Sequence, residues 1–304
     1  MKKAISVFFL VFIIVATFAQ TVGENGFTEL MKAAKNNDYK AASKLIAEKA
    51  DVNDADTYGW TSLMWAARNN AKDVISLLII ASADLEAKQE AGFTALMIAS
   101  AFGASDSLEL LINAGADVEN RNNIGMTALM TATETDSSKI AQILLDKGAD
   151  IEAADYYGKT AIMWAAIRNA DDTANLLIAY GADVDAQTHS PSYESEQEAN
   201  FWLSNTYDAY GKNDICETAL MFAAEKDSAD VIKLLIRESA NLEAKDTYGH
   251  TAMMYAAAYN STESLKLLID AGAKRAAKSA DGNTALSIAT GKGNKAAEEI
   301  ILSK

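Results

Sequence analysis

The pattern of apolar and polar residues repeats along most of the chain with a period of 33 residues. The segments TSLMWAA, TALMIAS, TALMTAT and TAIMWAA begin at Thr61, Thr94, Thr127 and Thr160. In each period this small and apolar segment is followed by a polar turn and by a second stripe of the form (I/V/L)xxLLI. Both segments have the apolar spacing of short helices. The period therefore predicts antiparallel helix pairs that stack one after another.

Recurring residues mark the ends of these helices. A glycine stands two residues before each threonine, as Gly59 does before Thr61, and indicates a turn with positive φ. The threonine hydroxyl can accept a free backbone N–H and so cap the first helix. A glycine after the leucine stripe, such as Gly115, ends the second helix. Leu111 in that stripe is expected to be buried between neighbouring copies.

Eight copies of this pattern fit between residues 23 and 304. The remaining copies begin at Thr28, Thr218, Thr251 and Thr284, and the first and the last are atypical. Thr160 and Thr218 are separated by one period and 25 additional residues, so the repeats contain one insertion. The predicted organisation is a leader at residues 1–19, repeats one to five at 23–187, an aromatic-rich insertion at 188–212 and repeats six to eight at 213–304.

The recurring motif resembles the ankyrin repeat. The family's usual run of Asp, two variable residues, Gly, any residue and Thr-Pro-Leu-His corresponds to residues 56–64, with Ser62 in place of Pro and Met64 in place of His. The period, the glycine, the threonine, an alanine pair, a leucine pair and a GAD segment recur together over nearly the whole chain after the leader. The resemblance implies an all-α solenoid of about eight helix-turn-helix repeats with turn or hairpin tips.

Methionine occupies the position at which the family usually has a hydrogen-bonding histidine. These residues are Met31, Met64, Met97, Met130, Met163, Met221 and Met254. A methionine series is compatible with copper binding or oxidation sensing. Adaptable filling of a core is the favoured interpretation, because one methionine falls on the predicted buried face of each of these repeats.

Aromatic residues are concentrated where ankyrin repeats usually bind proteins, on the turn tips and the inner surface of the first helices. Of the 15 rings outside the leader and the insertion, nine fall at such positions. Exposed tyrosine and tryptophan rings often anchor protein interfaces; the alternative is that some of these rings pack against the next turn. The candidate partner-binding residues are Tyr58, Trp60, Arg68, Phe93, Phe102, Tyr156, Tyr157, Arg168, Trp202, Tyr207, Tyr248, His250 and Tyr259.

The insertion contains five aromatic residues, which argues against disorder. We expect it to project from the binding edge and to add a second contact surface; a lid over a local apolar patch is the alternative. Just after it, Cys216 stands where the seven other copies have the turn glycine. Either the insertion changes that turn or Cys216 adopts a costly positive φ.

The composition and the first residues of the chain restrict its possible partners and its cellular location. The chain has 27 basic and 42 acidic residues and a formal charge of -15, which disfavours nucleic acid as a partner. Lys2 and Lys3 precede an apolar run at residues 4–16, which is typical of a cleaved signal peptide; an uncleaved anchor is the alternative. We expect an exported monomer, periplasmic or extracellular, with no membrane span after cleavage.

No catalytic, metal or cofactor motif fits its required context. The segment 291–296 matches a loose dinucleotide fingerprint but follows no strand, and the segment 54–59 lacks the ligands of a calcium loop. The aspartates that recur once per period, from Asp51 to Asp183, are expected to be structural. The sequence therefore predicts a non-enzymatic, exported scaffold that binds a partner protein through the concave ankyrin face. The alternatives are a secreted effector that acts on a host protein and an enzyme with a site in the insertion, where His189 and carboxylates lie.

Overall fold

The computed structural model describes residues 26–188 and 216–303. This part of the chain contains sixteen α-helices in eight pairs and, besides two isolated β-bridges, no extended pairing. The first helices of the pairs are α2 (Glu29–Lys35), α4 (Ser62–Arg68), α6 (Ala95–Ala101), α8 (Ala128–Glu134), α10 (Ala161–Arg168), α13 (Ala219–Lys226), α15 (Ala252–Tyr259) and α17 (Ala285–Lys292). The second helices are α3 (Tyr39–Ala47), α5 (Lys72–Ile80), α7 (Ser105–Asn113), α9 (Ser138–Asp146), α11 (Asp171–Ala179), α14 (Ala229–Arg237), α16 (Thr262–Asp270) and α18 (Lys295–Leu302).

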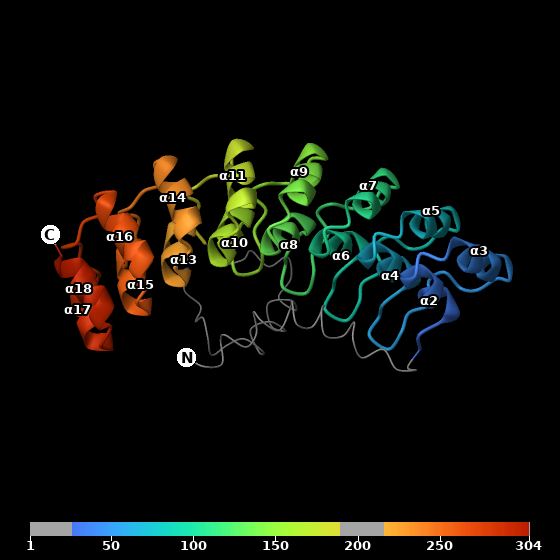
Figure 1. The fold of residues 1–304 in the computed structure, drawn as a ribbon, viewed down its shortest axis with the longest axis horizontal. Coiled ribbons are helices and arrows are strands. Elements are labelled where there is room, and N and C mark those ends of the chain that lie inside the picture. The colour runs from blue at the N-terminus through green and yellow to red at the C-terminus, as the bar shows by residue number, and fades with distance from the viewer. Residues whose placement is uncertain (1–25, 189–215, 304) are drawn as a thin grey trace. The chain divides into compact units, whose positions relative to one another are not determined.

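The described residues form two compact units, 26–123 and 124–188 together with 216–303. In the first unit α4 packs between α2 and α6, while α5 packs between α3 and α7. In the second unit the first helices pack in the order α8, α10, α13, α15 and α17, and the second helices pack in the same succession. Each unit therefore has two layers of helices, as the labels in Figure 1 show. The all-α repeat solenoid expected from the sequence is confirmed.

The predicted helix ends are present. The side chains of Thr28, Thr61, Thr94, Thr127, Thr218 and Thr284 accept a hydrogen bond from the backbone N–H three residues ahead. Thr160 and Thr251 have the same extended backbone but make no such bond. At the other end of the pair, Gly115, Gly148, Gly181 and Gly272 have φ between 88° and 98°. A residue with a Cβ is strained in this conformation, which explains why glycine ends these second helices.

The turn glycines have positive φ as predicted, from 73° at Gly158 to 83° at Gly92. Several of them also lie against the next turn, most closely Gly92, Gly125 and Gly249. A Cβ on Gly92 would lie 2.6 Å from the backbone nitrogen of Asn123, and a Cβ on Gly125 would lie 2.6 Å from that of Tyr156. Glycine is needed at these two positions both for the backbone conformation and for the close approach of successive turns.

The methionine series is buried, which confirms its interpretation as core. All seven methionines are at most 1% exposed, and so are most of the neighbouring alanines of the first helices. The recurring aspartates are structural, also as predicted. Asp51, Asp84, Asp117, Asp150 and Asp183 each accept a hydrogen bond from the backbone N–H two residues ahead. None of the helices in the described residues is long and apolar enough to cross a lipid bilayer.

Truncation of Leu111 to alanine should destabilise the first unit. Leu111 is fully buried on α7, and the packed helices around it cannot collapse into the resulting cavity. We expect a loss of roughly 2–5 kcal/mol in the free energy of unfolding, measured by urea denaturation. Leu110→Ala, at the half-buried neighbouring position, is the matched control and should cost clearly less. Equal losses for the two variants would contradict the assignment of the helix face.

Candidate partner-binding surface

Each turn tip is held in shape by the first residue of the tip. In the tip of residues 56–60, the carboxylate Oδ1 of Asp56 accepts the backbone N–H groups of Tyr58 and Trp60, both at 2.9 Å. The backbone N–H of Asp56 donates to the carbonyl of Trp60 at 3.0 Å, which closes the turn. Asp155 and Asp246 make the same pair of side-chain contacts in their own tips. The tips are therefore rigid platforms for the side chains at their centres.

Successive tips are joined by backbone hydrogen bonds. In the first unit the N–H of Glu90 donates to the carbonyl of Tyr58 at 3.0 Å. In the second unit the N–H of Tyr156 donates to the carbonyl of Ile124 at 3.1 Å, and that of Ala280 to the carbonyl of Tyr248 at 2.9 Å. Within each unit, neighbouring tips thus form a continuous edge, and the side chains on it have fixed spacings.

The structure exposes some of the candidate residues and buries others. Tyr248 at a tip is 49% exposed, and Tyr259 at the end of α15 is 56% exposed. The half-buried candidates are Tyr58, Arg68, Phe102, Tyr156, Tyr157, Arg168 and His250. Trp202 and Tyr207 lie outside the described residues.

Trp60 and Phe93 are buried, with only 4% and 2% of their surface exposed, so the expectation that these two rings are exposed is wrong. They occupy the last position of their tips, which lies directly before the capping threonine and the first helix. The Trp60 ring packs against Trp65 of α4, with 4.9 Å between ring centroids. Burial excludes Trp60 and Phe93 as surface contacts; they support the tips from beneath.

In the second unit this same position is occupied mostly by polar residues. The residues there are Met126, Lys159, Glu217, His250 and Asn283. Lys159 lies with its Nζ 4.9 Å from the centre of the Tyr157 ring and 5.3 Å from that of Phe222. The two units thus present different chemistry at equivalent positions.

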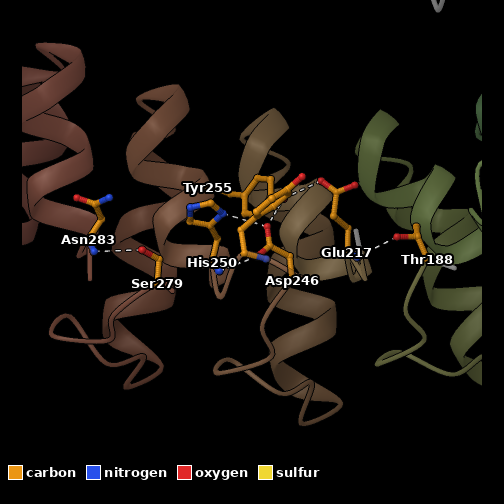
Figure 2. A network of polar contacts seen from close by, with 8 residues as sticks. Thr188, Glu217, Asp246, His250, Tyr255, Ser279 and Asn283 are labelled. Atoms are coloured by element: carbon orange, nitrogen blue, oxygen red, sulfur yellow. Dashed lines mark hydrogen bonds and ion pairs between the residues drawn. The ribbon is translucent and has the colours of Figure 1, made fainter. Parts of the chain in front are cut away.

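Glu217, Asp246, His250 and Tyr255 form a hydrogen-bonded cluster (Figure 2). The hydroxyl of Tyr255 on α15 lies 2.8 Å from Oε1 of Glu217 and 3.0 Å from Oδ2 of Asp246. Nδ1 of His250 lies 3.0 Å from the same Oδ2 atom. The phenol has one proton, so the two carboxylates compete for a single O–H donor.

Burial raises the pKa of the Glu217 carboxyl, and the nearby charges of Glu225 and Asp246 act in the same direction. Burial also raises the pKa of Tyr255, with the charges of Glu217 and Asp246 adding to the effect, so the phenol stays protonated as a donor. All the polar atoms of Asp246 are engaged by its own chain, since Oδ1 accepts two backbone N–H groups. The hydrogen bonds of Asp246 therefore have a structural role.

The cluster lies at the base of the insertion. Gln187 pairs with Thr218 in a β-bridge, as Ala55 pairs with Thr61 in an ordinary tip. The N–H of Thr188 donates to the carbonyl of Glu217, and the N–H of Glu217 donates to Oγ1 of Thr188, both at 2.9 Å. Thr188 and Glu217 therefore close the sixth tip in the way that Asp56 and Trp60 close the second. The insertion enters the repeat at this tip.

Cys216 occupies the place of the turn glycine and has φ of 57°. Of the two alternatives considered for this residue, the positive φ is therefore the one observed. A side chain in this left-handed conformation costs about 1–2 kcal/mol, which the bonds between Thr188 and Glu217 help to offset. Within residues 26–188 and 216–303, no group of three or more His, Cys, Asp and Glu side chains is suited to hold a metal ion.

The geometry agrees with the comparison to known families. A family model described as ankyrin repeats in three copies matches residues 7–89, 30–122, 96–188, 193–279 and 220–304. The chain is an ankyrin-repeat protein. Ankyrin repeats generally mediate protein–protein interaction and typically act as non-enzymatic scaffolds. No curated protein matches the chain significantly.

Sequence reasoning missed several rings that lie beneath or beside this ankyrin surface. Trp65, Trp164, Phe222 and Tyr255 share one position of the period on the first helices, away from the tips and the helix ends. The alignment at 33 residues contained the signal. Trp164 donates its Nε1–H to Oδ2 of Asp155 at 3.1 Å, at the position where Tyr255 donates to Asp246. The equivalent Nε1 of Trp65 is buried and has no hydrogen-bond partner.

Replacement of Glu217 by glutamine should change how stability depends on pH. A raised carboxyl pKa means that the folded chain binds this proton more tightly than the unfolded chain does. The contribution of Glu217 to stability is therefore present below its ordinary pKa of 4.5 and is lost as the pH rises through the folded pKa. We expect Glu217→Gln to melt at a higher temperature than the wild type near neutral pH, with the difference vanishing below pH 4.5.

Scanning calorimetry across this pH range measures the effect, and glutamine keeps an oxygen that can accept the Tyr255 hydroxyl. Glu263→Gln, at an exposed position on α16, is the control and should show little difference at any pH. A wild type that is more stable than Glu217→Gln near neutral pH would refute the assignment.

Proposed function

We propose that this ankyrin-repeat protein is an exported scaffold that binds a partner protein through its tips and first helices. The observation that carries the proposal is the set of tyrosines on rigid supports. Tyr58, Tyr157 and Tyr248 stand at the centres of tips closed by aspartate, and each is at least partly exposed. Rings held in place before binding lose little conformational entropy on association, and tyrosine provides both apolar area and a polar end.

The seventh repeat has the densest group of such rings. Tyr248 lies 6.1 Å from His250 between ring centroids, and His250 lies 6.2 Å from Tyr255. At the other end of α15, the Nζ of Lys292 lies 5.9 Å from the centre of the exposed Tyr259 ring. The two ends of one first helix thus present aromatic groups with polar neighbours. This combination is typical of the residues that dominate protein interfaces.

The proposed cellular location and class of partner follow from the sequence. Residues 1–19 have the pattern of a signal peptide, so we place the scaffold in the periplasm or outside the cell, as a monomer. The formal charge of -15 favours a protein over a nucleic acid as the partner. A secreted effector that acts on a host protein would use the same surface and would differ only in the origin of its partner. The insertion at residues 188–212, which we propose as an accessory contact, is joined to this surface at the sixth tip.

Removal of two exposed rings should abolish partner capture. In Tyr248→Ala/Tyr259→Ala, each lost ring is expected to cost about 2 kcal/mol of binding free energy if it is an interface anchor. A crosslinking pull-down from the native envelope fraction, with the wild type and the variant as bait, measures the loss. We expect the partner to be retained by the wild type and lost by the variant.

The matched control is Tyr39→Ala/Tyr180→Ala, which removes two exposed rings associated with second helices, Tyr39 at the start of α3 and Tyr180 at the end of α11. It should capture the same partner as the wild type, and circular dichroism should show that all three proteins are folded. Capture that survives the first pair of substitutions but not the second would show that the partner uses the layer of second helices.

A further inference from the structure

Arg68 lies between two aromatic rings in the first unit. It is the last residue of α4, and its Cζ is 4.8 Å from the centre of the Phe102 ring and 5.7 Å from that of Trp65. Lys35, the last residue of α2, places its Nζ 5.4 Å from the Trp65 ring. Because α4 packs on both α2 and α6, these side chains gather at the same end of three neighbouring first helices.

No carboxylate of the described chain neutralises this pair of cations. Neither Arg68 nor Lys35 makes a side-chain hydrogen bond or an ion pair with any residue in 26–188 or 216–303. The Nε atom of Arg68 is buried and has no partner, and the same is true of the Nε atom of Arg168. Partial burial also lowers the pKa of Arg68.

Arg168 shows the alternative arrangement in the second unit. It is also the last residue of a first helix, α10, but its guanidinium pairs with the carboxylate of Glu134 on α8. The Glu134 side chain is only 6% exposed. At this end of the first helices, Arg168 therefore has a well-buried carboxylate as its partner and Arg68 has none.

The surroundings of Arg68 stabilise its charge without using its hydrogen-bond donors. Ring faces attract a cation through their quadrupole, and the C-terminal end of a helix attracts it through the helix dipole. Neither interaction occupies the planar fork of N–H groups, whose geometry matches the two oxygens of a carboxylate. One guanidinium and one ammonium suit a singly charged carboxylate better than a doubly charged phosphate, which proteins usually bind with clusters of arginines.

We propose that Arg68, with Lys35 beside it and Trp65 and Phe102 as its apolar walls, is a subsite that recognises an aspartate or glutamate side chain of the bound protein segment. The proposal rests on the proposed function, because the carboxylate belongs to a partner that lies along the first helices. It adds the chemistry of that partner: an acidic residue with an apolar neighbour. A negatively charged scaffold thereby selects an acidic segment at one defined position.

The first test uses small probes and does not depend on a protein partner. N-acetylglutamate N-methylamide is titrated into the full chain, with N-acetylglutamine N-methylamide as the uncharged control. Nuclear magnetic resonance follows the Nε–H signal of Arg68 and the indole N–H signal of Trp65. We expect saturable shifts with the glutamate probe only, and no shift of the Trp65 signal in Arg68→Gln. Equal shifts with both probes, or no shift at Arg68, would overturn the proposal. Tighter binding of inorganic phosphate than of the glutamate probe would also overturn it and would identify a phosphoryl group as the ligand.

The second test selects ligands from a displayed library of random peptides on the full chain. Enriched peptides should share an aspartate or glutamate, and Arg68→Gln should weaken their binding at least about tenfold. Arg68→Lys, which keeps the charge without the fork, should recover only part of the affinity. Arg237→Gln on the second helix α14 should leave affinity unchanged.

The outcomes separate the subsite from the wider proposal and from a structural role. Enriched peptides that bind without an acidic residue and without Arg68 would refute the subsite and leave the proposed function standing. Glutamate-specific shifts without any enriched peptide would support the subsite and count against binding of protein segments. If Arg68 were only structural, Arg68→Gln would lower the melting temperature and leave the affinity for the enriched peptides unchanged; we expect the affinity to fall in a variant that circular dichroism shows to be folded.

Discussion

The constraint on which the rest of this structure depends is that one helix pair cannot bury its own apolar surface. The first helices are short and rich in alanine, and their methionines, such as Met64 and Met97, are covered only when the next copy is in place. Small residues let neighbouring helices approach closely, and methionine fills the space that remains. A repeat period that keeps these residues in register is therefore a requirement for folding, which explains why helix positions vary little while tip and helix-end positions vary widely.

The tips follow from the same constraint. Once neighbouring helix pairs pack closely, their tips also approach, and glycines such as Gly92 and Gly125 leave room for the backbone of the next turn. The resulting edge is rigid, so a side chain at its surface can change without altering the fold. The sixth tip shows that a long insertion can be accommodated at this edge. Its closing residues Thr188 and Glu217 are 29 positions apart in the sequence, yet α10 still packs directly on α13.

Most of the fold could be predicted from the sequence, because the period, the capping threonines and the turn glycines are local signals repeated many times. The site was less predictable. Trp60 and Tyr58 are two residues apart in one tip, but the hydrogen bonds to Asp56 place one ring beneath the tip and leave the other partly exposed. The contact between Glu217 and Tyr255 joins residues 38 positions apart, in two successive repeats that follow the insertion, so no single repeat contains its signal. The isolation of Arg68 is likewise a property of its surroundings in space.

The central claim is that a partner protein lies along the tips and the first helices. Site-specific photo-crosslinking in the native setting tests this claim most directly, with a photoreactive amino acid placed in turn at Tyr248, Tyr259, Tyr39 and Tyr180. All four side chains are exposed, but only Tyr248 and Tyr259 belong to the proposed surface. The account predicts one covalent adduct of the same mass from both Tyr248 and Tyr259, and none from Tyr39 or Tyr180. Adducts from Tyr39 and Tyr180 alone, or from none of the four positions, would contradict it.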